Sequence, residues 1–205
     1  MGGCRHGLAA VMAAAVVVGM VLGACGASSP RATTSATVPA TVASTAAADP
    51  YAVPATIDAA YLNRVFAALD HVEGDASRII VAKRALVPDA AERLSAIYGS
   101  DQFTLQTNAW LDLVDRGLAG FRDPVGDRRT TATRILSLST ACIFVATSRD
   151  YSAVDASPPP PKVEFVSLRP ADVAKDPSDL NPTPWIISWQ GFNRDGTEPP
   201  NKCAD

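Results

Sequence analysis

The sequence predicts an α+β fold in which helices come first and an antiparallel sheet follows, with the helices packed on one face of the sheet. Three observations lead to this prediction. Apolar residues recur at helical spacing in the first half of the expected domain, they alternate with polar residues in the second half, and glycine and proline separate the segments. Helices followed by strands are typical of α+β domains.

Four helices are expected before the strands. Ile57 and Tyr61 begin a stripe of apolar residues that continues at spacings of four and three, and Thr56 can cap the first turn. Gly74 suits the end of this first helix, and Pro88 suits the start of the third. The expected helices cover residues 56–73, 75–86, 89–98 and 100–118.

Four strands are expected beyond Gly120, because β-branched and aromatic residues become frequent there and alternate with polar ones. The run Pro158–Pro161 cannot donate hydrogen bonds to a sheet, so it must connect two strands. The expected strands cover residues 130–140, 141–154, 162–169 and 185–192.

The composition indicates one folded domain behind an apolar leader. Of the 205 residues 47% are hydrophobic, and the net charge is −3. Residues 52–205 are expected to form the single α+β domain, which is long enough for one sizeable core. The near-neutral charge excludes a nucleic-acid partner bound through a basic surface.

The N-terminus has the organisation of a signal peptide. Arg5 gives a positive start, residues 8–22 carry no charge, and the segment ends in Leu22-Gly23-Ala24-Cys25. This tetrad resembles the lipobox of bacterial lipoproteins. The resemblance implies that residues 1–24 are removed and that Cys25 carries lipid, which anchors the protein on the extracytoplasmic face of the cell membrane. An uncleaved transmembrane anchor is the alternative, since about twenty uncharged residues can just span a bilayer.

Residues 25–51 are expected to be the lipidated cysteine followed by a tether. Alanine, threonine, serine and proline make up nearly all of the segment after Cys25, and no aromatic residue is available for packing before Tyr51. Such a composition predicts a flexible spacer, either bare or O-glycosylated.

Two cysteines remain once Cys4 leaves with the leader and Cys25 is lipidated. In an oxidising compartment Cys142 and Cys203 are expected to form a disulfide. A buried free thiol at Cys142 or an intermolecular bond through Cys203 are the alternatives.

The sequence contains no recognisable catalytic, metal or cofactor motif. His71 is the only histidine after the leader, which excludes sites that need two. With Asp70, Glu73 and Asp75 it forms the densest ionisable cluster. His71 could act as a general base, but neighbouring residues on a helix point about 100° apart, so Asp70 does not naturally orient it. A solvated helix end is the favoured interpretation.

Tryptophans are the candidate lining of a ligand pocket. Trp185, Ile187 and Trp189 alternate along one expected strand and would share a face of the sheet. Trp185 and Trp189, with Trp110, could line an apolar pocket. Packing in the core beneath the helices is the favoured alternative.

A small group of arginines could contact lipid head groups. Arg128 and Arg129 are adjacent, Arg134 follows, and Asp123 and Asp127 dilute their charge. A solvated turn is the favoured interpretation.

Three stretches carry a resemblance to a family: residues 61–76, residues 142–145 and residues 181–185. Together with the lipobox they resemble a group of actinobacterial lipoproteins of the mycobacterial type, whose function is uncharacterised. The order of elements is also similar to the NTF2-like cone fold. That similarity implies a curved sheet and a concave apolar pocket between helices and sheet, and it carries over no active-site residue.

Three functions are therefore expected in order of preference. The first is a non-enzymatic lipoprotein that binds a small apolar ligand or a protein partner at the cell envelope. The second is an isomerase- or dehydratase-type enzyme of the cone fold that uses a pocket carboxylate or His71. The third is an envelope scaffold.

Overall fold

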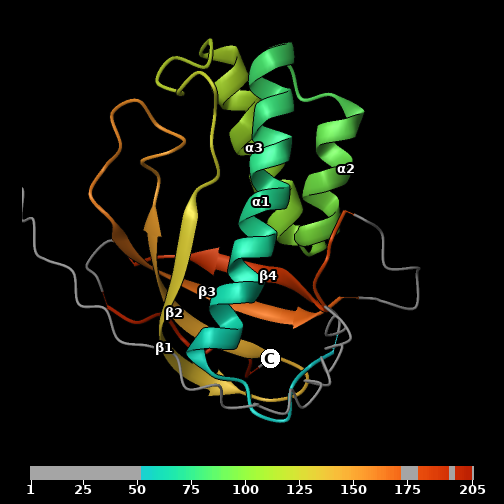
Figure 1. The fold of residues 1–205 in the computed structure, drawn as a ribbon, viewed down its shortest axis with the longest axis vertical. Coiled ribbons are helices and arrows are strands. Elements are labelled where there is room, and N and C mark those ends of the chain that lie inside the picture. Colours follow the sequence, from blue (N-terminus) through green and yellow to red (C-terminus); the bar gives the residue numbers. More distant parts are fainter. Residues whose placement is uncertain (1–51, 172–179, 194–196, 205) are drawn as a thin grey trace, which may run out of the picture. The chain divides into compact units, whose positions relative to one another are not determined.

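A computed structural model describes residues 52–171, 180–193 and 197–204. The expected signal peptide, Cys25 and the tether lie outside these residues. The expected α+β order is confirmed, with helices before an antiparallel sheet (Figure 1). The helices are α1 (Ala59–Lys83), α2 (Pro88–Ile97) and α3 (Ser100–Asp115), and the strands are β1 (Arg129–Leu138), β2 (Ile143–Asp150), β3 (Lys162–Pro170) and β4 (Trp185–Gly191).

The sheet is a meander in which each strand pairs antiparallel with the next, in the order β1-β2-β3-β4. Figure 1 shows α1 crossing the sheet, with α2 and α3 beside the C-terminal half of α1. The main core lies between α1 and the sheet. Its buried strand side chains are Ala132, Ile143, Val145, Val166, Leu168, Trp185 and Ile187.

One helix replaces the first two expected helices. It begins after Asp58, whose side chain accepts a hydrogen bond from the Tyr61 amide at 2.8 Å, and it continues through Gly74 to Lys83. Gly74 does not end the helix. Instead it admits a neighbouring loop, since a Cβ at this position would lie 2.0 Å from Asp127 Oδ1. The expected capping roles of Thr56 and Gly74 are therefore wrong.

The segment between α2 and α3 lies along the edge strand β4. Pro88 is the first residue of α2, as expected. Tyr98 then bridges to Ile187, and the Gly99 amide donates to the Ile187 carbonyl at 2.9 Å. One turn into α3, Gln102 Oε1 accepts from the Gln190 amide at 3.1 Å. Backbone groups of β4 are thus hydrogen-bonded by the helical part of the chain.

The opposite edge strand, β1, is covered by α1. Asn63 Oδ1 accepts from the Ala132 amide at 2.8 Å, and Asp70 Oδ2 accepts from the Thr130 amide at 2.6 Å. Asn63 and Asp70 are seven residues apart, which places them on the same face of the helix.

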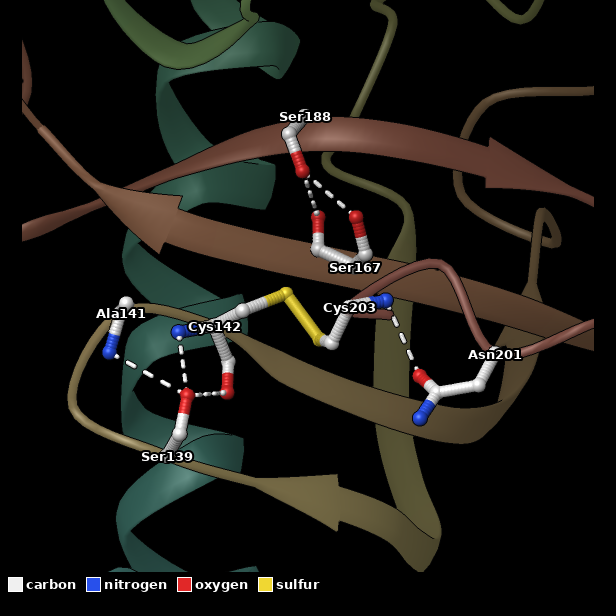
Figure 2. Close-up of a disulfide and its surroundings, with 7 residues drawn as sticks. All are labelled: Ser139, Ala141, Cys142, Ser167, Ser188, Asn201 and Cys203. Atoms are coloured by element: carbon white, nitrogen blue, oxygen red, sulfur yellow. Dashed lines mark hydrogen bonds between the residues drawn. A yellow bond between two sulfur atoms is a disulfide. The ribbon is translucent and has the colours of Figure 1, made fainter. Parts of the chain in front are cut away.

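A second, smaller apolar cluster lies on the other face of the sheet and is built on Phe144, Ala146 and Phe165. The C-terminal segment packs there, because a disulfide joins Cys142 to Cys203 (Figure 2). The Lys202 ammonium lies 5.1 Å from the centre of the Trp189 ring. The expected disulfide is confirmed, and the alternatives of a free thiol and an intermolecular bond do not apply.

Candidate functional site

A cavity of about 580 Å³ lies between α1, α3 and the helix-facing side of the sheet. Its wall is mainly apolar where α3 and the loop after it contribute. Leu105 and Phe192 both line the cavity and are more than half exposed, so they lie at its mouth. The rings of Trp110 and Phe121 stack with centroids 5.4 Å apart in its wall. The apolar lining residues include Leu105, Ala109, Trp110, Leu113, Phe121 and Phe192.

The other end of the cavity is polar because the strands change character along their length. Ile143 and Val145 belong to the core, and Thr147 and Arg149 follow on the same face of β2. On β3, Glu164 precedes Val166 in the same way. The sheet face beneath the helices is therefore apolar at one end and charged at the other.

Arg128 is the centre of the first buried polar group, here called the Arg128 cluster (Asp70, Glu73, Tyr98, Arg128 and Thr130). Arg128 is 7% exposed, and its Nε donates to Asp70 Oδ1 at 2.7 Å. Its Nη1 donates to Glu73 Oε1 at 2.8 Å, and the Tyr98 hydroxyl donates to Glu73 Oε2 at 2.6 Å. Thr130 donates to Asp70 through both its amide and its hydroxyl. Each carboxylate is thus held by several donors.

Arg149 is the centre of a second group, the Arg149 cluster (Arg149, Tyr151, Glu164 and Gln190). The Arg149 side chain is 1% exposed, and its Nη1 lies 2.9 Å from Glu164 Oε2. Its Nη2 donates to Gln190 Oε1 at 2.8 Å, whereas its Nε has no hydrogen-bond partner in the described part of the chain. The Tyr151 hydroxyl donates to Glu164 Oε1 at 3.3 Å.

Burial and charge shift the ionisation of these groups. Burial raises the pKa of Tyr98 and of Tyr151 in spite of the nearby arginines, so both hydroxyls stay protonated and act as donors. Burial alone would lower the pKa of Arg128. The charges of Glu73 and Asp70 outweigh it and raise that pKa well above the ordinary value.

Trp110 is the one of the three candidate tryptophans that lines this cavity. Trp185 lies in the main core, where its Nε1 donates to the Tyr61 hydroxyl at 2.8 Å. Trp189 packs on the opposite face of the sheet, near Phe144. The expectation that Trp185 and Trp189 share a face is wrong.

A β-bulge in β4 explains this difference. Ile187 pairs with Leu168 and Trp189 pairs with Ser167, so Ser188 is an extra residue in the ladder. An extra residue shifts the alternation of side chains by one and moves every later residue to the other face.

Two favoured interpretations of charged residues are also wrong. Asp70 was expected at a solvated helix end, yet it is 3% exposed and lies inside α1. Arg128 was expected in a solvated turn, yet it is buried against Asp70 and Glu73. Arg129 and Arg134 are exposed, and Arg134 pairs with Glu198 at 2.6 Å.

His71 lies outside the cavity. Its side chain is 63% exposed, and its Nδ1 lies 2.9 Å from Asp127 Oδ2. Burial alone would raise the pKa of Asp127, but hydrogen bonds from His71 and Arg78 outweigh it and lower that pKa below its ordinary value. Asp75 is part of the same surface group through Arg78 Nη2, at 2.6 Å.

Sequence reasoning missed Arg149 and Glu164, although a signal for them exists. Both occur in phase with the apolar residues of a strand, where a charged side chain points to the buried face. A charge in such a position is a candidate for a site, because burial of an ion requires a partner.

Within residues 52–171, 180–193 and 197–204, no helix is long and apolar enough to cross a membrane. In the same ranges, no three histidine, cysteine, aspartate or glutamate side chains are grouped so that they could hold a metal ion. Comparison of the chain with protein-family models, with curated proteins and with solved structures finds no match.

Proposed function

We propose that the protein is a non-enzymatic lipoprotein, anchored through lipid on Cys25 to the extracytoplasmic face of the cell membrane, whose domain binds a small and largely apolar ligand. The proposal of a ligand rests on the cavity of about 580 Å³ with its apolar wall. Cavities of this size and lining are typical of small-molecule sites. The anchor is supported by the sequence from Arg5 to Cys25.

Binding is favoured over catalysis by the state of the two glutamates of the cavity, Glu73 and Glu164. Both oxygens of Glu73 accept from Arg128 or Tyr98, and both oxygens of Glu164 accept from Arg149 or Tyr151. A general base needs a free oxygen within reach of the substrate. An enzyme that used either glutamate would therefore require a substrate that displaces these partners, and His71 does not line the cavity. Asp155, the third carboxylate of the lining, accepts through Oδ1 from the Ser157 backbone amide at 3.4 Å.

Ligand binding is tested by extraction and native mass spectrometry of the purified domain (residues 52–205). The core, the sheet and the disulfide all lie within this part of the chain, so it folds as one unit. We expect a co-purifying apolar compound. Ala109→Trp places an indole in the cavity wall and should lower the amount of compound that is recovered with the domain. Ala67→Trp, at an exposed position of α1, should leave this amount unchanged.

A domain that carries no compound and also takes up no apolar probe would contradict the binding proposal and leave the envelope scaffold. A protein partner in place of a small ligand would show as a complex that Ala109→Trp does not disturb. The anchor has its own test, since Cys25→Ala should abolish labelling of the protein by a clickable fatty acid. Labelling that persists in Cys25→Ala would overturn it.

A further inference from the structure

The polar end of the cavity contains two glutamine side chains whose orientation is fixed by the protein. Gln102 Oε1 accepts from the backbone N–H of Gln190 at 3.1 Å, and the side-chain oxygen of Gln190, Oε1, accepts from Arg149 Nη2 at 2.8 Å. In both cases the partner is a donor, so the amide oxygen must face it. The amide nitrogens, Gln102 Nε2 and Gln190 Nε2, are left for other partners.

Neither nitrogen has a hydrogen-bond partner among the residues that the structure describes. Both glutamines line the cavity, and Gln102 is only 3% exposed. Neither nitrogen is among the buried side-chain atoms that lack a partner, so both are open to solvent, and a ligand that supplies an acceptor oxygen can take the place of water there. Gln106, one turn further along α3, adds another amide to the same wall.

The charges around these amides disfavour an anion. Two guanidinium groups, Arg128 and Arg149, line the cavity with the carboxylates of Glu73, Asp155 and Glu164. Both guanidinium groups already hold carboxylates, with Asp70 behind Arg128. An anionic head group would meet an excess of negative charge and no free cation. An ammonium group would meet attractive charge but offers no acceptor to the two amides.

We propose that the ligand is a neutral amphiphile whose ester, amide, ether or hydroxyl oxygens accept hydrogen bonds from Gln102 Nε2 and Gln190 Nε2. Its apolar part lies against Trp110, Leu113 and Phe121. This inference rests on the proposed function, because it assigns the head group of the ligand in the same cavity. Two arginines in a cavity ordinarily suggest an acidic ligand, and here the carboxylates that both already hold disfavour one.

The test compares three probes with the same apolar chain: decanoylglycerol, which is neutral, decanoate, which is an anion, and decylamine, which is a cation. Binding to the domain (residues 52–205) is measured by isothermal titration calorimetry below the micelle-forming concentrations. We expect decanoylglycerol to bind at least about tenfold more tightly than either charged probe. Decanoate or decylamine binding as tightly as decanoylglycerol would overturn the head-group inference and leave the proposed function standing. If none of the three binds, the proposed function fails as well.

Gln102→Glu tests the role of the amide nitrogen directly. The carboxylate can still accept from the Gln190 amide, but a negative oxygen replaces the donor that faces the ligand. We expect roughly tenfold weaker binding of decanoylglycerol and tighter binding of decylamine. A merely structural lesion would weaken both probes, so parallel losses would contradict the assignment. Asn108→Asp makes the same change in charge on an exposed part of α3 that does not line the cavity, and it should alter neither affinity.

Discussion

Replacing Asp70 by asparagine removes one of the two carboxylates that face Arg128 in the Arg128 cluster. The Asp70 oxygens accept from Arg128 Nε at 2.7 Å, from the Thr130 amide at 2.6 Å and from the Thr130 hydroxyl at 2.9 Å. Asparagine offers one oxygen and one amino group. At least one of these donors would then face another donor in a buried position.

The expected loss of unfolding free energy is about 3 kcal/mol. Breaking a buried ion pair by removing one partner costs about 3–5 kcal/mol, because the remaining charge is left without compensation. Arg128 keeps its contacts with Glu73, at 2.8 Å and 2.5 Å, so the lower end of this range applies. Such a loss is large beside the roughly 5–15 kcal/mol by which folded domains are stable.

Urea denaturation of the domain at neutral pH, followed by far-ultraviolet circular dichroism, measures this loss. Asp75→Asn is the matched control, because Asp75 lies on the same helix and meets Arg78 at 2.6 Å with a side chain that is 36% exposed. An exposed pair is worth about 0–1 kcal/mol, so the control should change the stability little. Equal losses in the two variants, or a loss of less than about 1 kcal/mol for Asp70→Asn, would refute the reasoning.

Three further changes test separate parts of the fold. Gly74→Ala should lower the melting temperature, because the added methyl group would lie 2.0 Å from Asp127 Oδ1 and would push this carboxylate away from His71 and Arg78, which it meets at 2.9 Å and 2.7 Å. Alanine favours helices by about 1 kcal/mol over glycine, so a higher melting temperature would show that the lost contacts are worth less than this. The pKa of Asp127 lies below its ordinary value of 3.8 in the folded state. The ionised carboxylate should therefore stabilise the fold at neutral pH, and this contribution to the free energy of unfolding should be lost as the pH falls through the lowered pKa. In acid denaturation the stability of Asp127→Asn should therefore converge with that of the wild type, and a gap that persists at the lowest pH would speak against it. Cys142→Ser opens a loop with a sequence separation of 61 residues and should cost roughly 4 kcal/mol in the chain-entropy account, less any structure in the unfolded chain. It should also free the segment around Cys203, which packs on the same cluster as Trp189, and so increase acrylamide quenching of the tryptophan fluorescence. Unchanged quenching would count against this packing.

The sequence was sufficient for the fold class, because helical and strand periodicities are local properties of the chain. The four strands and the start of α2 at Pro88 lie within a few residues of their expected positions. Gly74 misled the assignment of α1, since its role depends on Asp127, a residue far away in the chain. Glycine suits both a helix end and a close approach of two segments, and the local pattern does not distinguish them.

The candidate site was predicted less well because it depends on pairing between elements. Trp110 was one of three possible pocket residues for which core packing was favoured, and it both belongs to the main core and lines the cavity. The burial of Arg128 could not be read from its charged neighbours, because its partners come from α1. Trp189 was misplaced because a bulge at Ser188 is visible only in the register between β3 and β4.

The hydrogen bonds that the helical part of the chain makes to the backbones of the two edge strands bear on how copies of the protein can associate. Edge strands with unpaired amides are templates on which a second copy can add a strand. Asn63 and Asp70 occupy amides of β1, and Gly99 and Gln102 occupy backbone groups of β4. Neither edge can therefore recruit a second sheet at these positions without first losing a helix contact. At two positions on each edge, the chain's own N-terminal half thus fills the hydrogen-bonding sites that a strand of a second copy would need.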